Sequence, residues 1–265
     1  MNKVHIALAC IGLITLSLSS CKEEIIVEKE VIVEKEVVSD SVVDYTTVSF
    51  TPSQDAYILR SDSSGAILNA RYDTVFGAGA GIYLKVGMSG NNNMFFRTLI
   101  QFDISAIPAG ATIKNASLLL STYRQGSDVT NYPIFVNRLT ESWTEGSATD
   151  YSGGAPFLQD ATGKGDATWV KRSVDGEDWS TFGGSFASVA SDSSSANNST
   201  PATFNNLASD VQLWVDGTEN NGWILKIADE YLTEAMESSL YRFYSNEGGA
   251  GKSAKPRLIV DYVVE

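Results

Sequence analysis

Two alternating runs on either side of a turn constrain the fold of this chain more than any other feature. In the first run, Phe96–Ile104, every second side chain is apolar or threonine and faces one way. A period of two is typical of a β-strand that lays one face on a core. Pro108 and Gly110 then interrupt the chain, and Ile113–Tyr123 alternates again. We predict that the two strands form a β-hairpin, the nucleus of a β-rich domain.

Short strand-like segments on both sides of this hairpin predict one all-β domain. Turn-forming clusters such as Gly87–Asn93 separate them. Leu207–Val215 differs, because its apolar residues recur at helical spacing and Gly217 follows. We therefore predict an all-β fold over residues 45–265, a jelly-roll-like antiparallel β-sandwich with one short helix. The other strands are predicted at Ala56–Arg60, Ile82–Val86, Ile134–Leu139, Thr168–Lys171, Gly222–Ala228, Leu240–Tyr244 and Leu258–Val263.

The hairpin sequence resembles the core motif of the DNRLRE domain, a family grouped with carbohydrate-binding module family 96. The motif reads R-x-L-I-x-F-D-I-S-x-I-P-x-G-A-T-I-x-x-A-x-L-x-L from Arg97 to Leu120. The resemblance extends from about Asp55 to Tyr262 and implies a jelly-roll-like β-sandwich. Some members of the family bind polysaccharides, including acidic ones such as alginate. Further matching segments are Leu139–Glu145, Trp179–Gly184, Val211–Gly217, Asn221–Lys226 and Lys255–Tyr262.

Residues 1–20 have the pattern of a signal peptide. Lys3 precedes the apolar run Ile6–Leu18, which is too short to span a bilayer stably. The segment ends in L-S-S-C, which resembles a bacterial lipobox with cleavage before Cys21 and lipidation of its thiol. The K-E-E that follows resembles the surface-export signal of Bacteroidetes lipoproteins. We expect a lipid anchor in the cell outer membrane, with the chain exposed at the cell surface.

Residues 21–44 join this anchor to the predicted domain. The hexapeptide I-V-E-K-E-V occurs twice, as Ile26–Val31 and Ile32–Val37. A period of six fits neither a coiled-coil heptad nor a solenoid repeat. We interpret the segment as an acidic low-complexity tether. The alternative is a helical or extended stalk that self-associates through its β-branched residues.

The residues left after processing restrict the possible chemistry. Cleavage removes His5 and Cys10, and lipidation uses Cys21, so the mature chain lacks histidine and a free thiol. It therefore cannot build a Ser-His-Asp triad, a Cys-His pair or a zinc site with nitrogen and sulfur ligands. The formal net charge of −13 becomes −14 without Lys3, which argues against nucleic acid as a partner.

Two-carboxylate glycosidase chemistry needs only acidic side chains, and Glu141 and Glu145 flank Trp143. We expect the simpler arrangement, with Trp143 in the core and the two glutamates at its solvated edge. The sequence therefore predicts that the protein is not an enzyme.

A polar loop between Trp169 and Trp179 is the candidate sugar-binding site. Aromatic rings stack on the C–H faces of sugars, and cations pair with uronic-acid carboxylates. For each candidate residue of this site, the alternative is a structural role. Trp214 and Trp223 are predicted to lie in the core. The candidate ligand-binding residues are Trp179, Trp169, Arg172 and Lys171 at this loop, with Tyr151 in another predicted loop.

A structural calcium ion is a further possibility, because Asp160 and Asp166 share one loop with two glycines. Hard cations prefer several oxygen ligands, although most Asp/Gly clusters are simply turns. These observations lead to two main hypotheses for function, beside which a lyase or hydrolase is a third. The first is non-catalytic binding of an extracellular polysaccharide by a cell-surface lipoprotein. The second is a structural or adhesive spacer module that binds protein partners.

Overall fold

The structure, a computed structural model, describes ten segments of the chain. They are 45–61, 75–77, 83–89, 94–123, 132–146, 167–173, 176–195, 200–227, 240–248 and 254–264. All ten lie in one compact unit that spans Asp44–Glu265. In these segments no helix is both long enough and apolar enough to cross a membrane. The predicted signal peptide, the lipidation site Cys21 and the tether lie outside the described residues.

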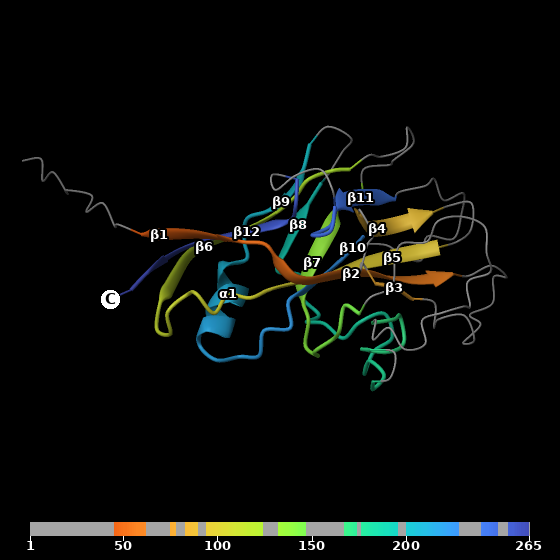
Figure 1. Cartoon of the computed structure of the whole chain (residues 1–265), viewed down its shortest axis with the longest axis horizontal. Coiled ribbons are helices and arrows are strands. Elements are labelled where there is room, and N and C mark those ends of the chain that lie inside the picture. The colour runs from red at the N-terminus through yellow and green to blue at the C-terminus, as the bar shows by residue number, and fades with distance from the viewer. Residues whose placement is uncertain are drawn as a thin grey trace, which may run out of the picture. The chain divides into compact units, whose positions relative to one another are not determined.

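Antiparallel strands in two sheets make up the unit, which confirms the predicted all-β sandwich with one short helix. The four-stranded sheet has the order β1-β12-β6-β9, and the larger sheet has the path β11-β4-β5-β10-β7-β8, with β2 paired to β5 and β3 paired to β2. Figure 1 shows β1, β6 and β12 at one end of the unit and β3, β4 and β5 toward the other. The strands are β1 (Thr46–Phe50), β2 (Pro52–Ser61), β3 (Val75–Gly77), β4 (Tyr83–Ser89), β5 (Met94–Phe102), β6 (Thr112–Leu120), β7 (Ile134–Arg138), β8 (Asp192–Ser194), β9 (Ala202–Phe204), β10 (Trp223–Ile227), β11 (Tyr241–Tyr244) and β12 (Arg257–Val263).

The predicted hairpin is wrong in its pairing, although both of its strands exist. Strand β5 belongs to the larger sheet, whereas β6 pairs with β12 and β9 in the smaller one. The turn at Pro108 and Gly110 therefore carries the chain from one sheet to the other. A Pro/Gly break ends a strand in either arrangement, so the local sequence does not distinguish a hairpin from a crossover.

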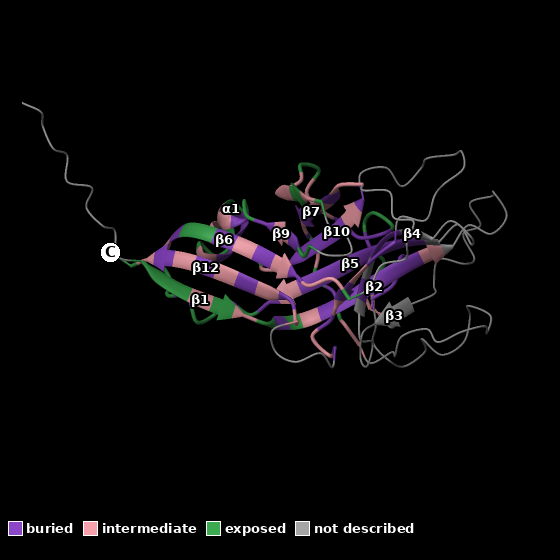
Figure 2. Ribbon diagram, turned by 90° about the horizontal axis from the view of Figure 1, so that it is seen from above, coloured by how far each residue is buried: buried purple, intermediate pink, exposed green. Residues whose placement is uncertain are grey.

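Strand β5 lies at the centre of the larger sheet. Strand β2 pairs along its whole length on one edge, and β4 and β10 share the other edge. Residues 95–100 are all buried, so the alternation in β5 does not separate a core face from a solvent face. In Figure 2 the buried colour follows β2 and β5, whereas β1 is largely exposed at the edge of its sheet. Both faces of β5 are therefore covered.

The two sheets are joined where the chain continues beyond β6. The Tyr123 N–H donates to the carbonyl of Arg242 at 2.8 Å, and the Tyr244 N–H donates to the carbonyl of Ser121 at 3.0 Å. Strand β11 thus pairs with β4 on one side and with residues 121–123 on the other. The larger sheet consequently curls toward the smaller one.

The predicted helix is α1 (Ala208–Val215), which packs on the core through Val211 and Trp214. Asp210 in its first turn fixes the helix to its neighbours. Its Oδ2 accepts a hydrogen bond of 2.7 Å from the indole N–H of Trp223 and another from the Ser191 hydroxyl. Its Oδ1 lies 3.6 Å from Nε of Arg138.

Candidate functional site

The two tryptophans of the predicted sugar site are buried. Trp169 is 3 % exposed and Trp179 is 2 % exposed, so neither ring offers a face to a ligand in this structure. The indole N–H of Trp179 donates to the carbonyl of Thr168 at 2.8 Å. The other three tryptophans are buried as well, as predicted for Trp143, Trp214 and Trp223.

Trp169 anchors its loop to the larger sheet through arginine side chains. The guanidinium of Arg97 lies 4.5 Å from the Trp169 ring centroid, and that of Arg60 lies 5.2 Å from it. Arg97 also donates a hydrogen bond of 2.6 Å to the carbonyl of Gly183. Gly183 has φ +85°, and a Cβ there would stand 2.7 Å from the Trp169 ring and 2.5 Å from that arginine, so the position favours glycine. The alternative structural role of Trp169 therefore accounts for its position.

Lys171 and Arg172 are paired with acids of their own loop. Lys171 Nζ lies 3.0 Å from Oδ1 of Asp178, and Arg172 forms an ion pair with Glu177. Thr168–Lys171 is a turn rather than the predicted strand, because the Thr168 hydroxyl accepts the N–H groups of Val170 and Lys171. An uronic-acid carboxylate would have to displace Asp178 or Glu177 to reach these cations.

The remaining sequence-predicted site residues lie outside the described residues. They are Tyr151, proposed as a ligand contact, and Asp160 and Asp166, proposed for calcium. Their roles stay predictions.

The two glutamates beside Trp143 have separate partners. The Glu141 carboxylate accepts hydrogen bonds from the backbone N–H and the hydroxyl of Ser180. Burial alone would raise the pKa of Glu141, but hydrogen bonds from Ser180 and Ser185 and the charge of Arg172 hold it below its usual value. Glu145 instead joins two other acids.

Three carboxylates from distant parts of the chain meet in one cluster. Asp55 is buried in β2, while the partly exposed Glu145 follows Trp143 and the partly exposed Glu247 lies in the turn after β11. One carboxylate oxygen from each lies within 4.8 Å of the other two. We refer to Asp55, Glu145 and Glu247 as the carboxylate cluster. Its oxygen-only donor set suits a hard cation.

The hydrogen bonds around the cluster leave two buried oxygens unsatisfied. Oδ2 of Asp55 accepts the Asn246 N–H at 2.8 Å, and the Asp55 N–H donates to Oε2 of Glu145 at 3.3 Å. Among the described residues, no donor group gives a hydrogen bond to Oδ1 of Asp55 or to Oε2 of Glu247, both of which are buried, and the two carboxyl groups lie close enough to share a proton. Burial, and then the charges of Glu247 and Glu145, raise the pKa of Asp55 well above its usual range.

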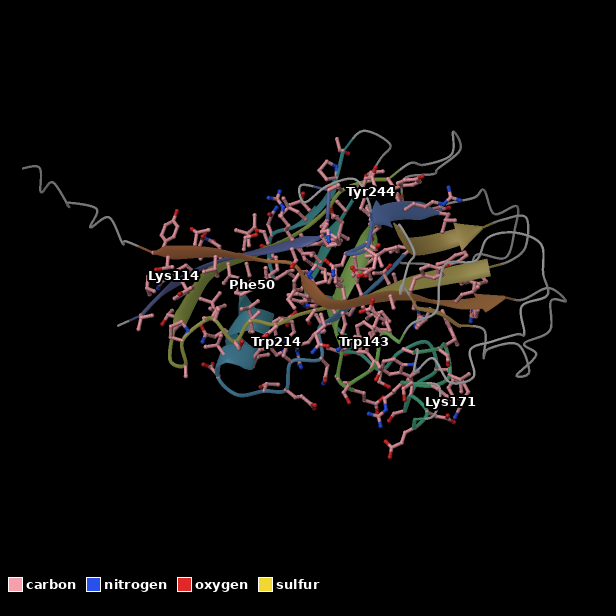
Figure 3. All side chains as sticks on the ribbon, in the orientation of Figure 1. Phe50, Lys114, Trp143, Lys171, Trp214 and Tyr244 are labelled. Carbon is pink, nitrogen blue, oxygen red and sulfur yellow. The ribbon has the colours of Figure 1, made fainter. Side chains whose placement is uncertain are left out.

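Partly exposed aromatic rings lie on the outer side of β11. The rings of Tyr123 and Tyr244 meet edge to face with centroids 5.2 Å apart, and Tyr123 is 38 % exposed. Arg242 lies opposite Tyr123 in the strand pairing and is partly exposed. We call Tyr123, Tyr244 and Arg242 the tyrosine face. Figure 3 shows Tyr244 and Lys171 at opposite edges of the unit, so this face is separate from the predicted loop.

Sequence reasoning missed both the carboxylate cluster and the tyrosine face. Alternation within the predicted strand Leu240–Tyr244 places Arg242 and Tyr244 on one face, which is a usable local signal. The cluster has no such signal, because 90 residues separate Asp55 from Glu145 and a further 102 separate Glu145 from Glu247. Only the folded chain brings these acids together.

No protein-family model matches the sequence, and a search of curated proteins finds no match. The resemblance to the DNRLRE domain therefore stays a prediction.

Proposed function

We propose that the protein is a non-catalytic cell-surface lipoprotein that binds an extracellular polysaccharide through the tyrosine face. The observation that carries this proposal is the edge-to-face pair of Tyr123, which is 38 % exposed, and the partly exposed Tyr244, beside Arg242. The lipid anchor at Cys21 would hold the module at the outer membrane. The site replaces the loop between Trp169 and Trp179, whose rings are buried.

The chemistry of the face suits a sugar polymer with carboxylates. Tyrosine rings present apolar surface to the C–H groups of a pyranose, while their hydroxyls reach its polar rim. A guanidinium pairs with a carboxylate through two parallel hydrogen bonds, so Arg242 would favour a uronic-acid polymer of the alginate type. The backbone hydrogen bonds between 121–123 and β11 hold the rings in place before binding, which lowers the ordering cost.

Affinity electrophoresis against neutral and acidic polysaccharides tests the proposal. We expect an acidic polymer to retard the full chain in mild detergent, and Tyr123→Ala or Tyr244→Ala to abolish most of that retardation. Phe182→Ala is the matched control, because Phe182 is also an exposed aromatic, at 52 %, but lies outside the tyrosine face. Retardation that is lost equally in all three variants, or absent with every polymer, would count against the proposal.

A second candidate is a structural or adhesive module that binds protein. Strand β1 is at the end of the four-stranded sheet, and in the described part of the chain only β12 pairs with it. An open strand edge can accept a strand from another chain. The β-branched hexapeptide repeat precedes β1 in sequence and could supply one. Cross-linking through Ile26–Val37, without glycan binding, would favour this candidate.

A further inference from the structure

We propose that the carboxylate cluster of Asp55, Glu145 and Glu247 binds a hard divalent cation, with calcium as the best fit. This site is separate from the Asp160–Asp166 loop considered from sequence. The proposal does not depend on polysaccharide binding.

The unsatisfied buried oxygens are the first reason. Asp55 is 0 % exposed, and no group in the described segments donates a hydrogen bond to its Oδ1. Oε2 of Glu247 is likewise buried and receives no hydrogen bond from the residues that the structure describes. A buried carboxylate oxygen without a partner is costly, because nothing replaces the water that it loses on folding. A cation coordinated through these two oxygens would replace the missing water.

The spacing of the oxygens is the second reason. Calcium–oxygen distances are about 2.3–2.6 Å, so two ligands on opposite sides of one ion stand roughly 5 Å apart. The three carboxylate oxygens of the cluster lie within 4.8 Å of one another. This spacing is compatible with coordination of one calcium ion by all three carboxylates.

The donor set selects the kind of cation. All three groups are carboxylates, and the only histidine and the two cysteines of the chain are His5, Cys10 and Cys21. Zinc and copper prefer nitrogen and sulfur, whereas magnesium requires near-ideal octahedral geometry and retains its waters. Calcium accepts six to eight oxygens in flexible geometry, and water can complete the shell on the open side of Glu145 and Glu247.

Such an ion would connect three parts of the fold that are remote in sequence. Asp55 belongs to β2, Glu145 follows the tryptophan at 143, and Glu247 follows β11. Glu247 lies only three residues after Tyr244. Calcium would therefore fasten the end of β11 to β2, and its removal would loosen that end first.

Calcium titration of the full chain after treatment with a chelator tests the site. We expect calorimetry to show one tight site and calcium to raise the melting temperature. Asp55→Asn and Glu247→Gln should each weaken calcium binding by more than the roughly 10- to 100-fold that loss of an outer-shell partner costs. Glu247 is partly exposed, so its variant should fold even if Asp55→Asn does not.

Two controls make the result specific. Asp178→Asn removes an exposed acid that is paired with Lys171 and should leave calcium binding unchanged. Asp160→Asn with Asp166→Asn tests the loop predicted from sequence and should also have no effect on this site. The proposal is overturned if the chain binds no calcium, or if calcium binding survives undiminished in Glu247→Gln. If Asp55 and Glu247 instead share a proton, the chain would bind no calcium, and the stability of the folded chain would rise as the pH falls.

Discussion

Gly222 shows how closely single residues fit in this sandwich. Its backbone has φ +73°, and a Cβ would stand 2.2 Å from the carbonyl oxygen of Ile100 on the neighbouring strand β5. Strand β10 begins one residue later. Glycine here permits both the left-handed conformation and the close approach of two backbones.

We expect Gly222→Ala to lower the free energy of unfolding by roughly 3 kcal/mol or more, from left-handed strain and the clash together. Gly110 is the matched control, because its φ is +81° but no described residue has an atom within 4 Å of the position that a Cβ would occupy. Gly110→Ala should cost only about 1 kcal/mol. Urea denaturation of both variants measures the difference, and equal losses would show that the contact with Ile100 is unimportant.

Arg97 is the second residue whose role follows from its contacts. Its guanidinium lies 4.5 Å from the Trp169 ring and 5.6 Å from the Phe186 ring, and it donates to the Gly183 carbonyl. Arg97→Lys keeps the charge but loses the planar stacking, so we expect a loss of about 2 kcal/mol in unfolding free energy. Arg257→Lys on partly exposed β12 is the control and should be nearly neutral. Unchanged stability in Arg97→Lys would contradict this role.

At the residue scale, sequence patterns identified aromatic residues but not their surroundings. Trp169 and Trp179 flank a polar loop, which in sequence resembles an exposed binding site. Their burial depends on Arg97, 72 residues before Trp169, and on the turn at Gly183. Because these partners are distant in sequence, no local sequence pattern indicates that the two tryptophans are buried.

At the element scale, helix α1 is held by one buried acid. Asp210 accepts hydrogen bonds from Trp223 and Ser191 and faces Arg138. Asp210→Ala would leave the indole N–H and the guanidinium without this partner, so we expect a loss of roughly 3 kcal/mol. Glu219→Ala, an exposed acid shortly after the helix, should change stability by less than about 0.5 kcal/mol. A small effect of Asp210→Ala in thermal denaturation would show that the helix is held by apolar packing alone.

At the junction between β8 and β9, Asp192 should make the stability of the fold depend on pH. Burial alone would raise the pKa of Asp192, but hydrogen bonds from the Asn206 side chain and from the N–H groups of Ser193, Asn206 and Asn205 hold it below its usual value. The folded state therefore gains stability from the ionised form above the unfolded pKa of about 3.9. That gain is lost as the pH falls through the lower, folded pKa.

Asp192→Asn removes this titration. We expect the variant to be less stable than the wild type at pH 7, with a difference that shrinks on acidification below about pH 4. Urea denaturation across that range measures it. A difference that stays constant with pH would show that the hydrogen bonds of Asp192 do not depend on its charge.

The existence of elements was more predictable than their pairing. The alternation that predicted Phe96–Ile104 and Ile113–Tyr123 reflects the backbone period of a strand, and both strands lie near the expected residues. The helical spacing of apolar residues predicted α1 in the same way. Pairing is a long-range property, and β5 pairs with strands that are near in sequence (β4) and distant (β10). The crossover at Pro108 could not be distinguished from a hairpin for that reason.

At the scale of the whole molecule, two long-range features converge near the end of β11. The tyrosine face lies on its outer side, and Glu247 of the carboxylate cluster follows it. If calcium fastens this end, chelation should weaken polysaccharide binding even though the ion does not touch the sugar. Titration of the polymer with and without chelator measures this link, and equal affinities would show that the two sites are independent.

The most direct test of the proposed function is the dissociation constant of the full chain for an acidic polysaccharide. We predict that Tyr123→Ala combined with Tyr244→Ala weakens binding roughly 5- to 150-fold, since two aromatic stacks of about 0.5–1.5 kcal/mol each contribute about 1–3 kcal/mol together. Phe182→Ala should leave the constant unchanged, and circular dichroism should show all variants folded. Wild-type affinity in the folded double variant would contradict the proposal that the tyrosine face binds the polymer.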